Sequence, residues 1–239
     1  MLEVEDLNTY RGIAHIIRGI SFAVRDTEVV CLVGRNGAGK TTTIDSLMGL
    51  LPVKSGKITF QGKTVTKLAP HKRAKIGMGY APEDCGIFPD LSVGENLTIC
   101  KWLAETSRKE KKQTSADNTD EKIFDLFPEL RRLMPKRGLF LSGGEKKMLA
   151  IARAMALEPS ILLLDEAFEG LAPVIVSRFC DAVKKIKEMG ISLLIAESNL
   201  RTGSKVADRL YAIDRGEIIF GGKPNEVFEQ EDVMKTIHG

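Results

Sequence analysis

The stretch Gly34-Arg35-Asn36-Gly37-Ala38-Gly39-Lys40-Thr41-Thr42 decides the fold of this chain. It matches the phosphate-loop pattern G-x-x-x-x-G-K-[ST], with Gly34, Gly39, Lys40 and Thr41 at the fixed positions. Glycines let the backbone fold tightly around a polyphosphate, so that successive N–H groups point at anionic oxygens. In this pattern the lysine neutralises the β- and γ-phosphates and the threonine hydroxyl ligates Mg²⁺. Residues 34–42, the phosphate loop, are therefore predicted to bind a nucleoside triphosphate.

The flanking residues predict a strand before the phosphate loop and a helix after it. Val29–Val33 is a short apolar run, typical of a buried strand. Residues 42–51 carry apolar side chains at helical spacing and end at Pro52. This arrangement places the phosphates at a helix N-terminus, where the helix dipole favours negative charge.

A second helix N-terminus suited to bind an anion is predicted later in the chain. Leu141-Ser142-Gly143-Gly144-Glu145, the signature segment, opens a helix predicted to run to Ala156, with Ser142 and Glu145 in a capping-box pattern. The N–H groups of the first helical turn have no intrahelical partner. One phosphate loop rarely needs a second such site, so service to the nucleotide of another chain is one hypothesis for this segment.

Two carboxylates end an apolar strand predicted over residues 161–164. Asp165 at this strand end can hold Mg²⁺ beside the phosphate loop, and Glu166 can accept a proton from an attacking water. The alternative, a solvated acidic turn, is the less favoured interpretation because the phosphate loop lies upstream. Tyr10, beside a turn at Arg11-Gly12, fits two interpretations equally: a ring that stacks on adenine, or a half-buried core tyrosine.

Composition excludes several classes of protein. The chain has 239 residues, 43% of them apolar and 28% charged, and a net charge of +3 that is too small to indicate nucleic acid binding. We expect no membrane span and no signal peptide, because apolar runs are short and acidic residues interrupt the N-terminus. The scattered cysteines predict reduced thiols in a cytosolic protein, without a metal site. They are Cys31, Cys85, Cys100 and Cys180.

Three polar stretches are predicted to lie on the surface. Residues 54–56 are expected to form a turn, and the basic residues 69–75 a surface turn whose solvated face is favoured over a binding patch. Residues 106–121 are predicted to form an exposed helix end and a mobile loop.

The order and spacing of Tyr10, the phosphate loop, the signature segment and residues 161–166 resemble an ABC transporter ATPase subunit over almost the whole chain. The resemblance implies an α/β fold: a P-loop NTPase (RecA-like) core with an N-terminal antiparallel β subdomain and an inserted helical subdomain. The core would comprise about residues 1–83 and 156–239, and the helical subdomain about 84–155. It also implies that two subunits sandwich two ATP molecules, each between the phosphate loop of one subunit and the signature segment of the other.

Shorter motifs are similar to the F-type ATPase subunit of branched-chain amino acid importers. They are Tyr80-Ala81-Pro82-Glu83, Ile87-Phe88-Pro89-Asp90-Leu91-Ser92-Val93, Glu95-Asn96-Leu97, Met148-Leu149-Ala150-Ile151-Ala152-Arg153-Ala154, Glu169-Gly170-Leu171-Ala172-Pro173 and Ala207-Asp208-Arg209. In that subfamily Glu83 stands where most relatives have the glutamine that senses Mg²⁺ and the membrane partner. The implied partners are a second ATPase subunit, of the G type or a second copy, two membrane permease subunits and, indirectly, a solute-binding protein. The implied location is the cytoplasmic face of the membrane.

Three positions depart from the pattern of most relatives. Ala167 replaces a proline, Phe168 replaces serine or threonine, and the switch position, usually histidine or glutamine, falls on Ser198. Serine is shorter than histidine and uncharged, which leaves open whether this loop contacts the γ-phosphate. Since Glu166 is present, we still expect hydrolysis. The alternatives are a non-transport ABC ATPase that acts on nucleic acid or ribosomes, and a nucleotide-gated subunit with weak hydrolysis.

Overall fold

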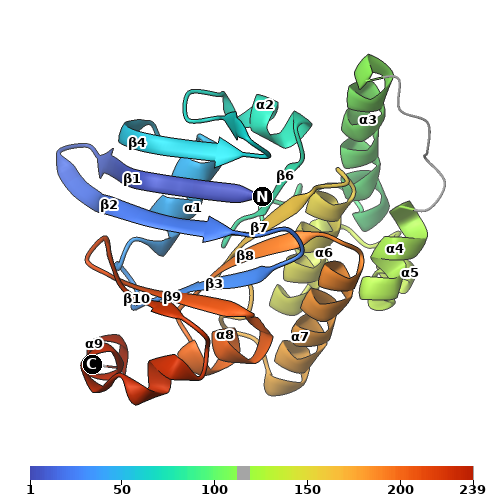
Figure 1. The fold of residues 1–239 in the computed structure, drawn as a ribbon. Coiled ribbons are helices and arrows are strands. Elements are labelled where there is room, and N and C mark those ends of the chain that lie inside the picture. Colours follow the sequence, from blue (N-terminus) through green and yellow to red (C-terminus); the bar gives the residue numbers. More distant parts are fainter. Residues whose placement is uncertain (112–118, 239) are drawn as a thin grey trace.

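Two sheets with a helix between them organise the chain (Figure 1). The computed structural model describes residues 1–111 and 119–238. The strands are β1 (Leu2–Arg11), β2 (Ala14–Val24), β3 (Val29–Val33), β4 (Val53–Phe60), β5 (Lys63–Thr64), β6 (Met78–Ala81), β7 (Ile161–Asp165), β8 (Ser192–Glu197), β9 (Arg209–Asp214) and β10 (Glu217–Gly222). The helices are α1 (Lys40–Met48), α2 (Pro70–Lys75), α3 (Val93–Lys111), α4 (Thr119–Leu126), α5 (Glu129–Leu133), α6 (Gly143–Met155), α7 (Pro173–Glu188), α8 (Leu200–Val206) and α9 (Glu231–His238), with short 3-10 helices at Gly138–Phe140 and Glu226–Glu229.

The central sheet has the strand order β10-β9-β3-β8-β7-β6, in which only the β9–β10 pair is antiparallel. Alternate residues of β3 enter two different cores. Val30 and Leu32 pack with α1 and the antiparallel sheet β2-β1-β4-β5, whereas Cys31 and Val33 pack with the helices on the opposite face. Because both faces are covered, every residue of β3, β7 and β8 is buried. The α/β fold class predicted from the sequence is confirmed.

The helices α3 to α6 lie between β6 and β7 in the chain and form the group at one side of the molecule in Figure 1. Pro128 lies between α4 and α5 and directly precedes the first residue of α5. Residues 106–111 extend α3, and the loop predicted within 106–121 falls mostly on residues 112–118, outside the described part of the chain. No helix in residues 1–111 and 119–238 has the length and apolar character to cross a bilayer.

The prediction of a turn at residues 54–56 is wrong. These residues belong to β4, where Ser55 pairs with Asn8 and Lys57 with Glu5 of β1. Hydrogen bonding to a strand that lies about fifty positions away overrides the local turn preference of Lys-Ser-Gly. Helix α8 was also not predicted; Asn199 caps it by accepting a hydrogen bond from the N–H of Thr202 at 3.0 Å.

The basic stretch 69–75 is not simply a solvated surface turn, because it contains α2 and the buried Arg73. The Arg73 guanidinium donates to four backbone carbonyls and so closes the C-terminal end of α1, where cations are favoured. These acceptors are the oxygens of Leu68 (2.9 Å), Ser46 (2.9 Å), Leu47 (2.6 Å) and Thr66 (2.7 Å).

Replacing Arg73 by methionine should destabilise the protein, since four carbonyls, two of them in buried and two in partly buried hydrogen bonds, would lose a charged donor. We expect the free energy of unfolding to fall by ~2–4 kcal/mol in urea denaturation. Lys72→Met removes the same charge from an exposed position of α2 and is the control. Equal stability of the two variants would contradict the role assigned to Arg73.

Candidate functional site

The phosphate loop connects β3 to α1 and is held by the β9–β10 turn. Gly39 precedes α1 with φ 115°, a left-handed conformation that L-residues rarely adopt. Gly34 is required for a different reason: a Cβ at this position would lie 2.3 Å from the carbonyl oxygen of Ile213 in β9. The N–H of Gly216 donates to the carbonyl of Ala38 at 2.8 Å, which ties the turn to the loop.

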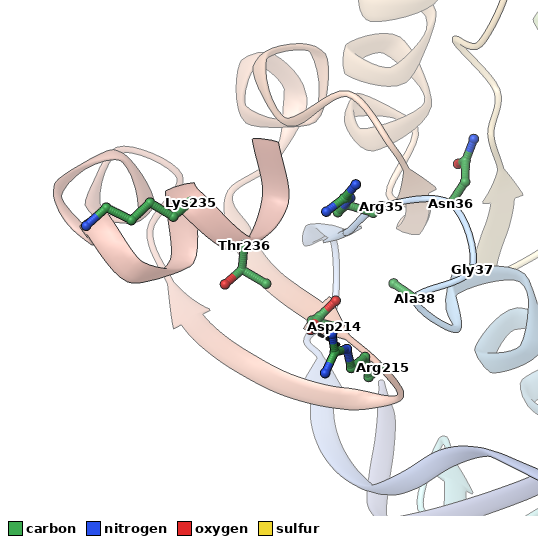
Figure 2. Close-up of a pocket in the computed structure, with 8 residues that line it drawn as sticks. All are labelled: Arg35, Asn36, Gly37, Ala38, Asp214, Arg215, Lys235 and Thr236. Atoms are coloured by element: carbon green, nitrogen blue, oxygen red, sulfur yellow. Dashed lines mark ion pairs between the residues drawn. The ribbon is translucent and has the colours of Figure 1, made fainter. Parts of the chain in front are cut away.

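The outer face of the phosphate loop lines a groove of about 560 Å³ (Figure 2). Its walls come from residues 35–38, from the β9–β10 turn and from α9. In Figure 2 Asp214 and Arg215 lie together as an ion pair of 3.8 Å, while Lys235 of α9 points away from the loop. The cationic side chains therefore do not converge on one point of this groove.

The inner face of the loop lines a cleft of about 460 Å³, and Lys40 is the buried cation in its wall. Its Nζ lies 2.9 Å from Oε1 of Glu166 and donates to the carbonyls of Gly34 at 2.7 Å and Arg35 at 3.1 Å. Lys40 and Glu166 are 4% and 5% exposed, so their attraction is weakly screened. The cleft is lined by Arg11, Ile16, Asn36, Gly37, Gly39, Lys40, Thr41, Thr42, Glu83, Glu166 and Glu169.

The two predicted Mg²⁺ ligands, Thr41 and Asp165, lie together beside this cleft. The Thr41 hydroxyl donates to Oδ1 of Asp165 at 3.3 Å, and Oδ2 of Asp165 is buried without a hydrogen-bond partner among the described residues. The pKa of Asp165 is raised to about 6: burial is the largest cause, the hydrogen bond from Thr41 opposes it, and the charges of Glu166 and Glu83 add to it. An orphaned carboxylate oxygen next to a hydroxyl is a donor set that suits Mg²⁺. Glu83 lines the same cleft.

Glu166 begins the turn formed by residues 166–169, which we name the catalytic turn. Its backbone is left-handed, with φ 48°, a conformation that costs free energy in a non-glycine residue and is often found at functional sites. One carboxylate oxygen faces Lys40, and the other accepts hydrogen bonds from the N–H of Ser198 at 3.0 Å and its hydroxyl at 3.1 Å. The structure thus brings Lys40, Glu166 and Ser198 together, and Ser198 fixes the orientation of the carboxylate.

Two of the three positions that depart from the family pattern, Ala167 and Phe168, are buried in the catalytic turn, and only Phe168 is assigned a packing role. Phe168 is buried and packs against Phe179 of α7, with ring centroids 6.3 Å apart at 64°. Ala167 is buried beside it. The catalytic turn therefore rests on the α7 side of the core through an aromatic side chain.

Tyr10 stacks on the ring of His15, with centroids 4.3 Å apart and planes 2° from parallel. The Tyr10 side chain is partly exposed and is not among the described residues that line the cleft. Its neighbour Arg11 does line the cleft and donates to the hydroxyl of Thr42 at 3.1 Å and to Asp45 at 2.6 Å. Sequence reasoning missed Arg11, because no local pattern marks a contact with a residue 31 positions away.

The signature segment forms the start of α6, as predicted. Ser142 caps the helix by accepting from the N–H of Glu145 at 3.3 Å, and the Glu145 carboxylate accepts from the N–H of Ser142 at 2.8 Å. Ser142 and Gly143 are exposed, whereas Leu141 is buried. None of residues 141–145 is among the described residues that line the cleft of their own chain. This placement leaves the helix start accessible to a second molecule.

Glu197, at the end of β8, is a buried carboxyl that sequence reasoning did not single out. It is 1% exposed; Oε1 accepts from the N–H of Asn199 at 3.1 Å, and Oε2 has no hydrogen-bond partner in the described chain. The pKa of Glu197 is raised to about 7, mainly by burial and also by the nearby Glu166 carboxylate, against hydrogen bonds that lower it. A charge at this position would therefore be costly.

Glu197→Gln should make the protein less sensitive to pH. The folded state keeps a proton on Glu197 up to about pH 7, while the unfolded chain releases it near 4.5, so the wild type loses stability as pH rises between these values. The difference in free energy of unfolding, variant minus wild type, should be ~2–4 kcal/mol larger at pH 8 than at pH 4. Urea denaturation at both pH values measures this difference, with exposed Glu3→Gln as control. A Glu197→Gln gain independent of pH would contradict the prediction.

The chain is similar to known proteins in both sequence and fold. The family model described as ABC transporter matches residues 17–169. A probable branched-chain amino acid transport ATP-binding protein, LivF of Archaeoglobus fulgidus, is 32% identical over 100% of this chain and 99% of its own length. The lipopolysaccharide export system ATP-binding protein LptB of Escherichia coli K12 is 33% identical over 96% of this chain and 93% of its own. The solved ATP-binding cassette MJ1267, in its ADP conformation, matches with a TM-score of 0.84 and 27% identity over 100% of this chain and 98% of its own.

Proposed function

Since the chain belongs to the ABC transporter family, in which it is an ATP-binding and ATP-hydrolysing subunit, we propose that it energises an importer of branched-chain amino acids or related small solutes. Cassettes of this family use ATP with Mg²⁺, form dimers and pair with membrane permease subunits. The proposal includes the direction of transport (import), the solute, a G-type partner subunit, a solute-binding protein and a location at the cytoplasmic face of the membrane.

The proposed chemistry follows from the contacts in the cleft. The N–H groups of the phosphate loop and Lys40 bind the phosphates; Thr41 and Asp165 would hold Mg²⁺, which would supply charge neutralisation there. The Glu166 carboxylate, oriented by Ser198, accepts a proton from the water whose oxygen attacks the γ-phosphorus, and the bond from that phosphorus to the bridging oxygen breaks as ADP leaves. The signature segment of the partner donates N–H groups to the γ-phosphate from the other side. Positioning and electrostatics supply most of the rate in this scheme.

Glu83 is the observation that favours import. This carboxylate lines the cleft, and it lies in the tetrapeptide Tyr80-Ala81-Pro82-Glu83, which resembles the F-type subunit of branched-chain amino acid importers. The LivF relative supports the same choice. A second candidate is energising a lipid exporter, because LptB is equally similar over nearly the whole chain.

Reconstitution tests the proposal. The chain should be co-expressed with the permease genes next to its own gene and any neighbouring second ATPase gene, then placed in proteoliposomes. We expect ATP-dependent uptake of labelled leucine or a similar small solute when its binding protein is present, and no uptake with Glu166→Gln. ATP-dependent release of lipopolysaccharide without solute uptake would instead establish the export function. ATP hydrolysis without either activity, and without permease genes nearby, would favour a non-transport ATPase.

A further inference from the structure

The side chain of Lys147, in α6, contacts the backbone of the catalytic turn. Its Nζ donates one hydrogen bond to the carbonyl of Glu166 and a second, of 2.9 Å, to the carbonyl of Glu169. These two carbonyls are at the beginning and the end of the same turn. The N–H of Glu169 also donates to the Glu166 carbonyl, at 3.3 Å, so the ammonium closes a turn that is already folded back on itself.

The catalytic turn needs support because Glu166 has a left-handed backbone. Such a conformation persists in a non-glycine residue only when its surroundings hold it. Ser198 and Lys40 hold the carboxylate of Glu166, and Lys147 holds its main chain. Hydrogen bonds from an ammonium are stronger than those between neutral groups, and here one donor binds two acceptors.

Lys147 also lies on the helix that begins with the signature segment. Ser142 and Gly143 are exposed at the first turn of α6, and Lys147 follows about one turn later on the same element. A helix moves as a unit, so a displacement at its first turn reaches the Nζ of Lys147 and the carbonyls it binds. The first turn of α6 also packs near Leu171 and Ile175, which follow the catalytic turn in the chain.

We propose that Lys147 is a positioning residue that couples the signature segment, facing the partner subunit's ATP, to the catalytic carboxylate of its own chain. Binding of ATP between the subunits engages the start of α6, and Lys147 transmits the position of α6 to the catalytic turn. Hydrolysis at one site is thereby linked to occupancy of the other. This inference rests on the proposed roles of Glu166 and the signature segment.

The first test compares kcat and KM for ATP in the assembled transporter. We expect Lys147→Met to lower kcat 10- to 100-fold with KM within about twofold of the wild type, because the carboxylate is displaced while the phosphate loop is intact. Lys147→Arg keeps a cationic donor. The logarithm of its fold-loss in kcat should therefore be at most two thirds of the value for Lys147→Met. Lys146→Met is the matched control, because it removes the neighbouring charge of α6 and should stay within twofold. A folded Lys147→Met variant with wild-type kcat would overturn the proposal.

The second test measures the coupling itself. Gly143→Ala adds a methyl group where its own chain leaves open space, so it perturbs the partner-facing surface without straining the fold. If Lys147 transmits the signal, Gly143→Ala should lower kcat less in the Lys147→Met background than in the wild type. If the fold-loss in kcat of the double variant equals the product of the fold-losses of the two single variants, the coupling is overturned. If Glu166→Gln keeps its turnover, the assigned base is wrong; if Glu166→Gln is inactive but Lys147→Met is normal, only the role of Lys147 fails.

Discussion

Glu166→Gln is expected to lose steady-state ATP hydrolysis by at least ~10³-fold while it retains ATP binding. Glutamine has the same shape and keeps an oxygen that can accept from the N–H and hydroxyl of Ser198, which lie 3.0 and 3.1 Å from the present carboxylate oxygen. It cannot accept the proton of an attacking water. Phosphate release measures the first effect, and equilibrium binding of ATP measures the second.

The control for this experiment is Glu169→Gln, which removes another carboxylate from the wall of the same cleft. We expect it to keep most of its turnover, because its charge is not assigned a role in proton transfer. Steady-state hydrolysis by a clean Glu166→Gln preparation at a tenth of the wild-type rate or more would contradict the assignment of Glu166 as the base.

Lys40→Met is expected to weaken ATP binding by ~10²-fold or more and to destabilise the protein without nucleotide by ~3 kcal/mol. The first effect follows from loss of the cation that faces the phosphates. The second follows from the buried ion pair of 2.9 Å, because Glu166 would remain as a buried charge without its partner. Isothermal titration with ATP and urea denaturation without ATP measure the two effects separately.

The double variant Lys40→Met/Glu166→Gln separates these two causes. Removing both charges should restore most of the lost stability, since no buried carboxylate is left unpaired, while ATP binding stays weak. If the double variant is as unstable as Lys40→Met alone, packing at Lys40 rather than its charge accounts for the loss of stability.

Local patterns were sufficient to predict the elements that carry the site. The apolar run of β3, the glycines and lysine of the phosphate loop and the capping box of α6 are each defined by residues within a few positions of one another. Their physical basis is local: strand periodicity, permissive glycine dihedrals and hydrogen bonds between neighbouring residues. The fold class followed from these elements and from the family resemblance.

Contacts between distant residues could not be predicted in this way. Arg73 looked like one of several surface cations, because two of the four carbonyls it binds, those of Ser46 and Leu47, belong to α1, more than twenty positions earlier. The strand pairing of residues 54–56 depends likewise on β1. In both cases the preference of a short segment is overruled by a partner that only the folded chain supplies.

The sequence by itself determined that this chain binds a nucleoside triphosphate and that its phosphate loop, signature segment and paired carboxylates belong to one family. Only the tertiary structure decided how the catalytic carboxylate is held. Ser198 lies 32 positions from Glu166 and Lys147 lies 19 positions from it, on different elements, yet both bind the same residue. The sequence left open whether serine at the switch position contacts the γ-phosphate, and the fold makes this serine a hydrogen-bond donor to Glu166. The physical reason is that a side chain's role depends on which partners the packing of strands and helices brings within about 3 Å, and no local pattern encodes that distance.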